Sequence, residues 1–277
     1  MERTLYINGN EEGLHVVVDG PSLLIKKPQC AERRIPFNLI SSVVIFGDLF
    51  VKTSVLTTLS EYNIPILFIS KWAKNMNISV PINYSISAKC SKIEKIFKDA
   101  QKVEEFRVWA RAKRVYLQTD ILRKVYQWDP VYFESVWSWD YNFVSKHYRD
   151  IIEFLMPTDK EKWITVRKIV KVLFWNAVMD YLLDIGFDIH CGIIHTQSAF
   201  GLIRDCLYIL AAEIDYQALK FFKTESVDEI MDKEVKEFLL KANAVLNIVN
   251  RFENLRFVLN KVLKDIKDKL DELIIEK

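Results

Sequence analysis

A histidine and an aspartate lie ten residues apart in the stretch 175–222, which holds three of the chain's seven glycines. A helical pattern of apolar residues stops at Gly186, the chain passes Gly192 and His195, and a second helical pattern runs through Asp205. Loops held on a rigid scaffold often carry binding and catalytic groups. Imidazole nitrogen and carboxylate oxygen can together ligate Mn²⁺ or Mg²⁺, and the nitrogen favours Mn²⁺. On residue types alone, a single histidine before a helix is more often a capping or core residue, so both interpretations stand.

The strongest charge bias lies in residues 88–125, where eleven Lys and Arg residues face five Asp and Glu residues, a surplus of six. Arg107, Arg111 and Arg114 recur at helical spacing and can share one helix face, with Lys113 beside them. Such a row could neutralise the phosphates of a nucleic acid, and an ordinary solvated face is the alternative. Because the whole chain carries a formal charge of only +2, a nucleic-acid surface must be a local patch.

The first 80 residues read as β-structure. Short β-branched runs are separated by turn signals, and the Asp19-Gly20 pair predicts a hairpin. The predicted elements are strands at Thr4–Ile7, Leu14–Val18, Ser22–Lys26, Ile40–Phe46 and Ile64–Ile69, and a helix at Ser54–Tyr62.

From about residue 85 the pattern changes to helical periodicity. No proline follows Pro157, and glycines are few, as expected of a helical domain. A near-heptad apolar pattern after Ile248 predicts a long amphipathic helix, which either covers the bundle or meets a partner. We therefore predict an α+β chain, with a β-sandwich at 1–84 and an all-α domain at 85–277 that carries the candidate site.

Several classes of protein are excluded. No run of 18 uncharged apolar residues exists, and the N-terminus lacks a signal region. We therefore expect a soluble, cytoplasmic protein that does not associate with a membrane. The four cysteines show no metal or disulfide spacing. No glycine occurs between Gly47 and Gly186, and no Walker or dinucleotide fingerprint is found elsewhere.

The pattern G-F-D-x-x-x-G-I-I-H, followed by a polar loop and a helix that opens with a carboxylate, resembles CRISPR-associated protein one, the integrase subunit of spacer acquisition. The resemblance implies that His195 and Asp205 are a metal histidine and an acidic residue of the site, with Asn176 on the preceding helix. The family's second acidic position, three residues after the first, is Tyr208 here. A phenol with an ordinary pKa of about 10 is a poor ligand for Mg²⁺ at neutral pH.

The same resemblance extends over nearly the whole chain. It implies that Asp140 is the first metal carboxylate, with Glu134 as the competing candidate. The segments that follow, including Trp163 and Arg167 ahead of Asn176, keep the family's order. Together with the basic row, we expect DNA contacts from Arg107, Arg111, Lys113, Arg114 and Arg167.

The resemblance also implies a function. We expect a metal-dependent DNA endonuclease and integrase of spacer acquisition that uses Mn²⁺ or Mg²⁺ at Asp140, His195 and Asp205. The implied partners are the spacer precursor and repeat-array DNA, a second copy joined through the β domains, and a small ferredoxin-like CRISPR-associated protein. The alternative is a catalytically impaired paralogue that acts as a DNA-binding or assembly subunit, which Tyr208 and Asp140 favour.

Overall fold

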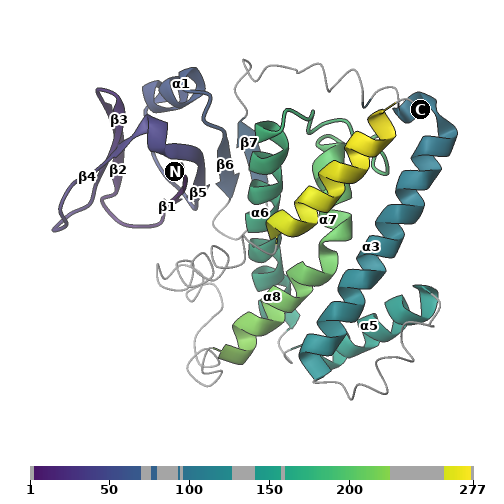
Figure 1. Ribbon diagram of the computed structural model, residues 1–277. Helices are drawn as coiled ribbons and strands as arrows, with labels where there is room; N and C mark the ends of the chain where they lie inside the picture. The colour runs from purple at the N-terminus through teal and green to yellow at the C-terminus, as the bar shows by residue number, and fades with distance from the viewer. Residues whose placement is uncertain are drawn as a thin grey trace. The chain divides into compact units, whose positions relative to one another are not determined.

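The structure, a computed structural model, describes residues 3–69, 76–79, 93, 96–126, 141–156, 160–224 and 259–275. These residues form two compact units. The first comprises the described residues up to 79 and contains the sheets, and the second comprises those from 93 onward and is helical (Figure 1). The expected mixture of sheets with a helical C-terminal region is confirmed.

The first unit contains a mixed sheet with strand order β1-β5-β6-β7. Its strands are β1 (Arg3–Asn8), β5 (Ile40–Phe46), β6 (Ile66–Ile69) and β7 (Met76–Ser79). The strands β1 and β6 both pair in parallel with β5, whereas β7 runs antiparallel to β6. The β-branched run of β5 is almost entirely buried, as expected of a strand with a neighbour on each edge.

A second, antiparallel sheet has the order β2-β3-β4, with β2 (His15–Asp19), β3 (Ser22–Lys26) and β4 (Arg33–Pro36). The hairpin predicted at Asp19-Gly20 joins β2 to β3, and Gly20 has a positive φ of 59°. Strand β4 was not predicted, because Arg-Arg-Ile-Pro has no apolar alternation and its two arginines are exposed. A short 3-10 helix, η1 (Phe37–Leu39), leads into β5.

One hydrophobic cluster unites the two sheets. It contains side chains of β1, β5 and β6 from the first sheet and of β2 and β3 from the second, such as Ile7, Val43 and Leu23. Helix α1 (Thr53–Glu61) connects β5 to β6 and adds Val55 and Leu59 to this cluster. The apolar residues therefore hold the first unit together across both sheets.

The second unit consists of long helices and two shorter ones. They are α3 (Ala100–Tyr126), α5 (Tyr141–Leu155), α6 (Lys160–Asp184), α7 (Gly201–Ile209) and α8 (Ala211–Thr224), and residues 259–274 form a further helix. Helices α7 and α8 both contact α3 and α6, and α5 contacts α3. The short helix α7 therefore lies between two long ones, which gives the loop before it a firm support.

The C-terminal helix packs along α3. Lys113 Nζ lies 2.5 Å from Asp265 Oδ2, and Lys102 Nζ donates at 2.8 Å to the carbonyl oxygen of Leu273, near the helix end. Its apolar side buries Val262, Ile266 and other residues at helical spacing. The predicted amphipathic helix thus covers the bundle in the part that the structure describes.

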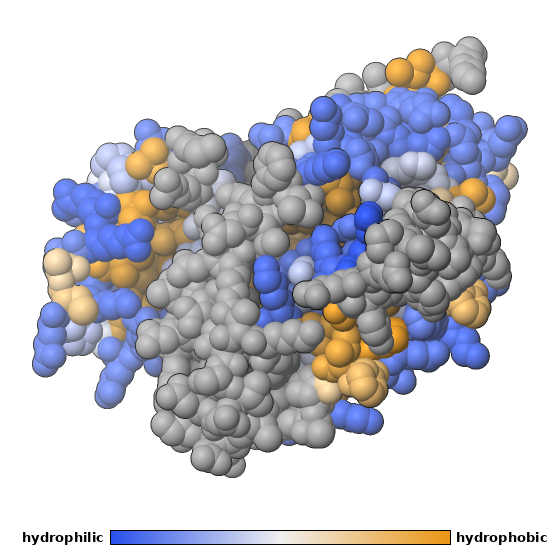
Figure 2. All heavy atoms as spheres, turned by 60° about the horizontal axis from the view of Figure 1, so that its bottom comes forward, coloured by the Kyte–Doolittle hydropathy of each residue, from blue (hydrophilic) through white to orange (hydrophobic). Residues whose placement is uncertain are grey.

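The coloured part of the surface is mostly hydrophilic (Figure 2), as expected when the apolar side chains are buried in the two units. Figure 2 shows hydrophilic side chains over much of the coloured surface, with hydrophobic side chains in smaller patches. Among the described helices, none is at once long and apolar enough to cross a bilayer.

Candidate functional site around His195

The candidate site is a loop clamped between α6 and α7. Helix α6 ends at Asp184, and Gly186 follows with a φ of 76°, a conformation that glycine adopts without strain. The loop then returns so closely to α7 that a Cβ on Gly201 would lie 2.6 Å from the carbonyl oxygen of His195 and 2.7 Å from the amide nitrogen of Gly192. The approach requires glycine at both positions, because a Cβ on either residue would clash with the other. The close contact fixes His195 against the start of α7.

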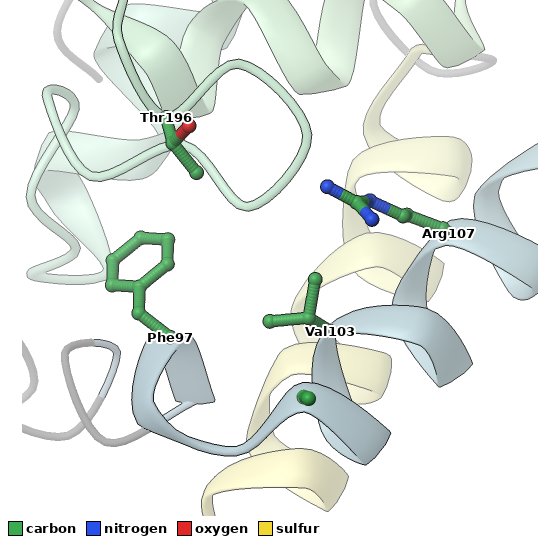
Figure 3. A pocket seen from close by; sticks show the side chains of 5 residues that line it. Phe97, Val103, Arg107 and Thr196 are labelled. Carbon is green, nitrogen blue, oxygen red and sulfur yellow. The ribbon is translucent and has the colours of Figure 1, made fainter.

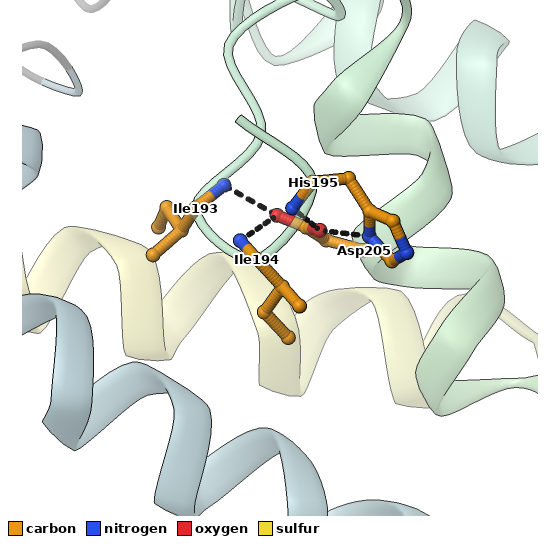
Figure 4. Close-up of polar contacts among 4 residues, drawn as sticks. All are labelled: Ile193, Ile194, His195 and Asp205. Carbon is orange, nitrogen blue, oxygen red and sulfur yellow. Dashed lines mark hydrogen bonds and ion pairs between the residues drawn. The ribbon is translucent and has the colours of Figure 1, made fainter. Parts of the chain in front are cut away.

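Asp205 holds the loop from within. Its Oδ2 accepts hydrogen bonds from the amides of Ile193 at 2.5 Å and Ile194 at 3.0 Å, and its Oδ1 accepts one from the amide of His195 at 3.0 Å (Figure 4). Oδ1 also lies 2.6 Å from the ring Nδ1 of His195. The residue is 0% exposed. Both carboxylate oxygens are therefore occupied by the chain itself, and Asp205 acts on the geometry of the loop.

His195 is oriented by this carboxylate. Because a carboxylate oxygen can only accept, Nδ1 is the donor in the contact with Asp205, and Nε2 is the ring nitrogen left for another partner. The imidazole side chain is 34% exposed, against 1% for its carboxylate partner. The arrangement resembles the carboxylate-oriented histidines of metal and acid-base sites, in which the second nitrogen meets a ligand or a proton.

Tyr208 occupies the next turn of α7 and faces the imidazole. The centroids of the Tyr208 and His195 rings lie 6.4 Å apart in an edge-to-face arrangement. The guanidinium carbon of Arg114 lies 4.4 Å from the centroid of the Tyr208 ring, within the range of a cation–π interaction. A cationic side chain from α3 therefore lies over the tyrosine that stands where the resemblance implied an acidic ligand.

The described residues do not form a set that would hold Mn²⁺ or Mg²⁺. His195 Nε2 is available, but Asp205 has four donors on its two oxygens, and Tyr208 offers an aromatic face to a guanidinium. No cluster of three or more His, Cys, Asp or Glu side chains suited to a metal occurs within the described part of the chain. Asp140 and Glu134, the two candidates for the first carboxylate, lie outside the described residues.

The other residues of the loop region have separate roles. The ring of His190 lies 4.6 Å from that of Phe200, and Cys191 Sγ lies 3.2 Å from Asp188 Oδ2, so neither points to a shared metal with His195. Asn176, which is 2% exposed, donates to Asp180 Oδ2 at 3.2 Å, one turn further along α6.

A cavity of about 450 Å³ lies between this loop and the start of α3. Its lining includes Phe97, Val103, Arg107 and Thr196, the residue that follows His195 (Figure 3). Arg107 extends toward the loop, and it forms an ion pair with the exposed Glu104, with 3.7 Å between Arg107 Nη1 and Glu104 Oε2. The cavity thus brings one member of the predicted basic row next to the candidate site.

The other basic residues predicted to contact DNA have different surroundings in the structure. Arg111 is exposed on α3, and Arg114 contacts Tyr208. Lys113 is paired with Asp265 between two helices, so its charge is already offset. Arg167 on α6 forms an ion pair with Asp215 of α8.

Sequence reasoning missed Asp215 and Tyr148. Asp215 is 8% exposed and accepts a hydrogen bond at 3.1 Å from the hydroxyl of Tyr148, in addition to its pairing with Arg167. Burial, together with the Asp215 carboxylate, raises the pKa of the Tyr148 phenol far above its ordinary value. The sequence signal was an acid on the apolar side of a helix, but its partners lie 48 and 67 residues away.

Comparison with known proteins gives a family match in the N-terminal part of the chain. Residues 5–126 match a family model described as CRISPR associated protein Cas1. The match covers the described first unit from residue 5 onward and α3, and it ends before the His195 loop. No protein among the curated sequences matches the chain.

Solved structures extend the similarity to the whole chain. A CAS1 protein from Thermotoga maritima matches with a TM-score of 0.76 and 15% identity, covering 99% of this chain and 98% of that one. A casposase bound to its integration product matches with a TM-score of 0.69 and 16% identity, covering 100% and 92%. A Cas6-RT-Cas1–Cas2 complex matches with a TM-score of 0.71 and 13% identity, covering 98% of this chain and 35% of the other. At these identities the likeness establishes the fold.

Proposed function

Because the chain belongs to the CRISPR-associated Cas1 family, we propose that it acts on DNA as a nuclease or integrase of spacer acquisition, with His195 at the centre of its site. The family and the casposase likeness support a Cas1-type nuclease and integrase role. The observation that carries the proposal for this site is the buried Asp205 carboxylate, which orients the partly exposed His195 ring through Nδ1 and leaves Nε2 for another partner.

In this proposal Asp205 is a positioning residue and His195 is the catalytic one. Asp205 fixes the loop through three amides and the tautomer of the ring through Nδ1. His195 Nε2 then meets the reacting group, and it can accept the proton of an attacking DNA 3′-hydroxyl or of water. A fixed ring orientation favours this step because no rotamer search precedes it.

The cavity beside the loop supplies a place for the DNA end. Arg107 can neutralise a backbone phosphate, and the aromatic ring of Phe97 can stack on a base. Thr196, which lines this cavity, directly follows His195 in the chain, so the cavity lies beside the candidate site. We therefore assign Arg107, Arg111 and Arg114 to the DNA-contacting face of α3.

Proteins of the Cas1 family are generally metal-dependent. Because Nε2 has a single lone pair, we propose as the alternative role that it would ligate a divalent ion, Mn²⁺ or Mg²⁺, together with a carboxylate from Asp140 or Glu134, instead of accepting a proton. When bound, such an ion activates a hydroxyl and stabilises charge on phosphate oxygens. Asp205 would support this arrangement through the histidine ring, because both of its oxygens already accept hydrogen bonds from the loop and the ring.

The partners follow from the family. We propose a homodimer that forms through the first unit, with its two sheets arranged as a β-sandwich, because both contribute to one apolar cluster and offer strand edges. Assembly with a Cas2-type partner is supported by the Cas6-RT-Cas1–Cas2 complex, in which a similar fold occurs. A monomeric mass in light scattering of the full chain would exclude the homodimer.

The test is strand transfer by the full-length chain on branched DNA with Mn²⁺ or Mg²⁺. His195→Ala should lower the rate about 100-fold or more, since a positioned acid-base group contributes roughly 10²–10⁴-fold. His190→Ala is the matched control, because it lies in the same loop but stacks on Phe200. Equal rates in His195→Ala and His190→Ala would refute the proposed role of His195.

A second candidate function is that of an impaired paralogue, a DNA-binding or assembly subunit with little chemistry of its own. The observation that favours it is Tyr208, which holds the place of an expected acid and lies beneath Arg114. Under this hypothesis the wild type binds DNA, but its transfer rate equals that of His195→Ala. Tyr208→Glu alone should not restore activity, because the new carboxylate would pair with the adjacent guanidinium.

A further inference from the structure

Phe200, the residue that precedes α7, has a backbone conformation that a bulky side chain rarely adopts. Its φ is 60° and its ψ is 41°, in the left-handed region. Among the residues that the structure describes, the other non-glycine residues with a positive φ are Gln29 and Asn63, and both are exposed. A phenylalanine keeps this conformation only when the contacts around it compensate for the strain.

This conformation determines how the chain enters α7. The residue before a helix ordinarily has an extended backbone, and its side-chain oxygen accepts a hydrogen bond from the first turn. Phe200 has neither feature, and the left-handed backbone turns the preceding loop back over the start of the helix. The amide of Leu202 then donates at 3.2 Å to the carbonyl oxygen of Ile189, near the beginning of the loop.

The phenyl ring of Phe200 contacts two aromatic residues from different parts of the chain. Trp175 of α6 is buried and meets the ring edge-to-face, with 5.9 Å between the ring centroids and 73° between the ring planes. His190, from the loop, lies with its ring centroid 4.6 Å from that of Phe200. Both separations are typical of favourable aromatic pairs. These three residues, the aromatic clamp, link α6, the loop and α7.

The clamp adjoins the backbone contact that fixes His195. Gly201 follows Phe200 directly, and a Cβ on it would lie 2.6 Å from the carbonyl oxygen of His195. The same carbonyl oxygen accepts a hydrogen bond at 3.2 Å from the amide of Ser198. A change of φ at Phe200 would move Gly201 away from this carbonyl. Asp205 binds the amide of His195 from the other side, so the residue is held at both its amide and its carbonyl.

We propose that Phe200 is a positioning residue for His195. Its ring, held by Trp175 and His190, keeps the backbone in the left-handed region, and that conformation keeps Gly201 against the carbonyl of His195. The inference rests on the proposed function in one respect, namely that His195 is the catalytic residue. Glycine would adopt the same backbone without strain, but it would lose the ring that ties the loop to α6.

Two substitutions separate the backbone of Phe200 from its ring. Phe200→Gly removes the ring and adopts the left-handed backbone freely, whereas Phe200→Ala removes the ring and retains the strain. Phe200→Tyr is the conservative variant, because it keeps the ring. The matched control is Gln29→Gly, which relieves a φ of 59° in the first unit.

The first measurement follows the imidazole itself in the full-length chain. The chain has four histidines, so labelling with ¹⁵N-histidine gives four sets of ring signals, and His195→Ala identifies the set of interest. In alkaline buffer, a neutral ring with its proton fixed on Nδ1 has two well-separated ¹⁵N shifts, and a ring that exchanges between tautomers has averaged ones. We expect separated shifts in the wild type and in Phe200→Tyr, and averaged shifts in Phe200→Gly and Phe200→Ala.

The second measurement is strand transfer, together with the melting temperature. Phe200→Gly should lower kcat about tenfold or more and leave KM unchanged, since a small misplacement of a catalytic group costs up to about 100-fold. His190→Ala should lose less, because His190 is exposed. Phe200→Ala should melt below Phe200→Gly, and Phe200→Tyr and Gln29→Gly should transfer strands at the wild-type rate.

Two results would overturn the inference. One is a wild-type set of His195 ring shifts in Phe200→Gly, because the ring would then not be needed. The other is an equal melting temperature for Phe200→Gly and Phe200→Ala, because the left-handed backbone would then not be required. If the ring shifts change in Phe200→Gly while strand transfer does not, Phe200 positions His195 and the proposed catalytic role of His195 fails.

Discussion

The two units bury different kinds of side chain. In the described part of the first unit, the buried polar residues are two serines, Ser22 and Ser42. The described part of the second unit buries two acids and an amide on one helix alone, together with further polar residues; the set is Gln118, Thr119, Asn176, Asp205, Glu213, Asp215 and Gln217. The first unit therefore has an almost purely apolar core, and the second contains a polar network.

The first unit's core contributes mainly to the stability of its fold, whereas the buried polar groups of the second unit position the residues of the candidate site. Apolar burial stabilises a fold without specifying a site, whereas a buried carboxylate is tolerated only when every oxygen finds a donor. Asp205 meets this condition with three amides and an imidazole, and Asp215 meets it with an arginine and a phenol. The polar groups thus determine where His195 and Arg167 lie, at the expense of greater sensitivity to substitution.

The largest contrast should come from changing one buried polar side chain in each unit. Asp205→Asn replaces one accepting oxygen by an NH₂ group, which leaves at least one buried amide of the loop without a partner. We expect a loss of about 3 kcal/mol in unfolding free energy, since each unsatisfied buried group costs roughly 1–3 kcal/mol. Ser42→Ala, which removes a 3.1 Å contact with Thr4, should cost about 1 kcal/mol.

Denaturant unfolding of the full-length variants measures both changes. If the chain shows two transitions, Asp205→Asn should shift the one that belongs to the helical unit and Ser42→Ala the other. Equal losses in both variants would contradict the view that the polar network is the more sensitive part.

A smaller contrast is expected at glycines. A Cβ on Gly201 would lie 2.6 Å from the carbonyl oxygen of His195, so Gly201→Ala must displace the loop and should cost about 1–3 kcal/mol, as overpacking does. Gly20, in the β2–β3 turn, has open space around its Cβ position but a φ of 59°. Gly20→Ala should therefore cost about 1 kcal/mol from backbone strain alone.

Melting temperatures and strand-transfer rates of these two variants separate the effects. Gly201→Ala should lower both, because it moves His195, and Gly20→Ala should lower only the melting temperature. A Gly201→Ala variant with wild-type transfer would show that the close approach of the loop to α7 is not required for activity.

The smallest contrast concerns ion pairs. The Lys113–Asp265 pair joins two helices with side chains 22% and 37% exposed, whereas Arg34 and Asp19 pair across the second sheet at 63% and 42%. Double-mutant cycles to Ala should give a coupling of about 0.5–1 kcal/mol for the first pair and about 0.3 kcal/mol for the second. Both couplings should decrease in 1 M salt, and a larger value for the sheet pair would reverse the comparison.

Much of the fold was predictable from the sequence because it depends on local patterns. Alternating β-branched runs with turn residues between them located β1, β2, β3, β5 and β6, and helical periodicity located α6 and α7. Glycine usage marked the loop that carries His195. Strand β4 escaped prediction because an exposed edge strand carries no apolar alternation.

The sequence by itself determined that an imidazole stands in a glycine-bounded break, ten residues before a carboxylate, because spacing and residue type are local properties. The tertiary structure alone decided what that carboxylate does. Asp205 points back at the loop and binds its amides, a choice set by the close approach of Gly192 to Gly201. Packing of α3 against α7 likewise set the guanidinium of Arg114 over Tyr208, although 94 residues separate them in the chain. Contacts of this range depend on how whole helices pack, and no window of sequence contains that information.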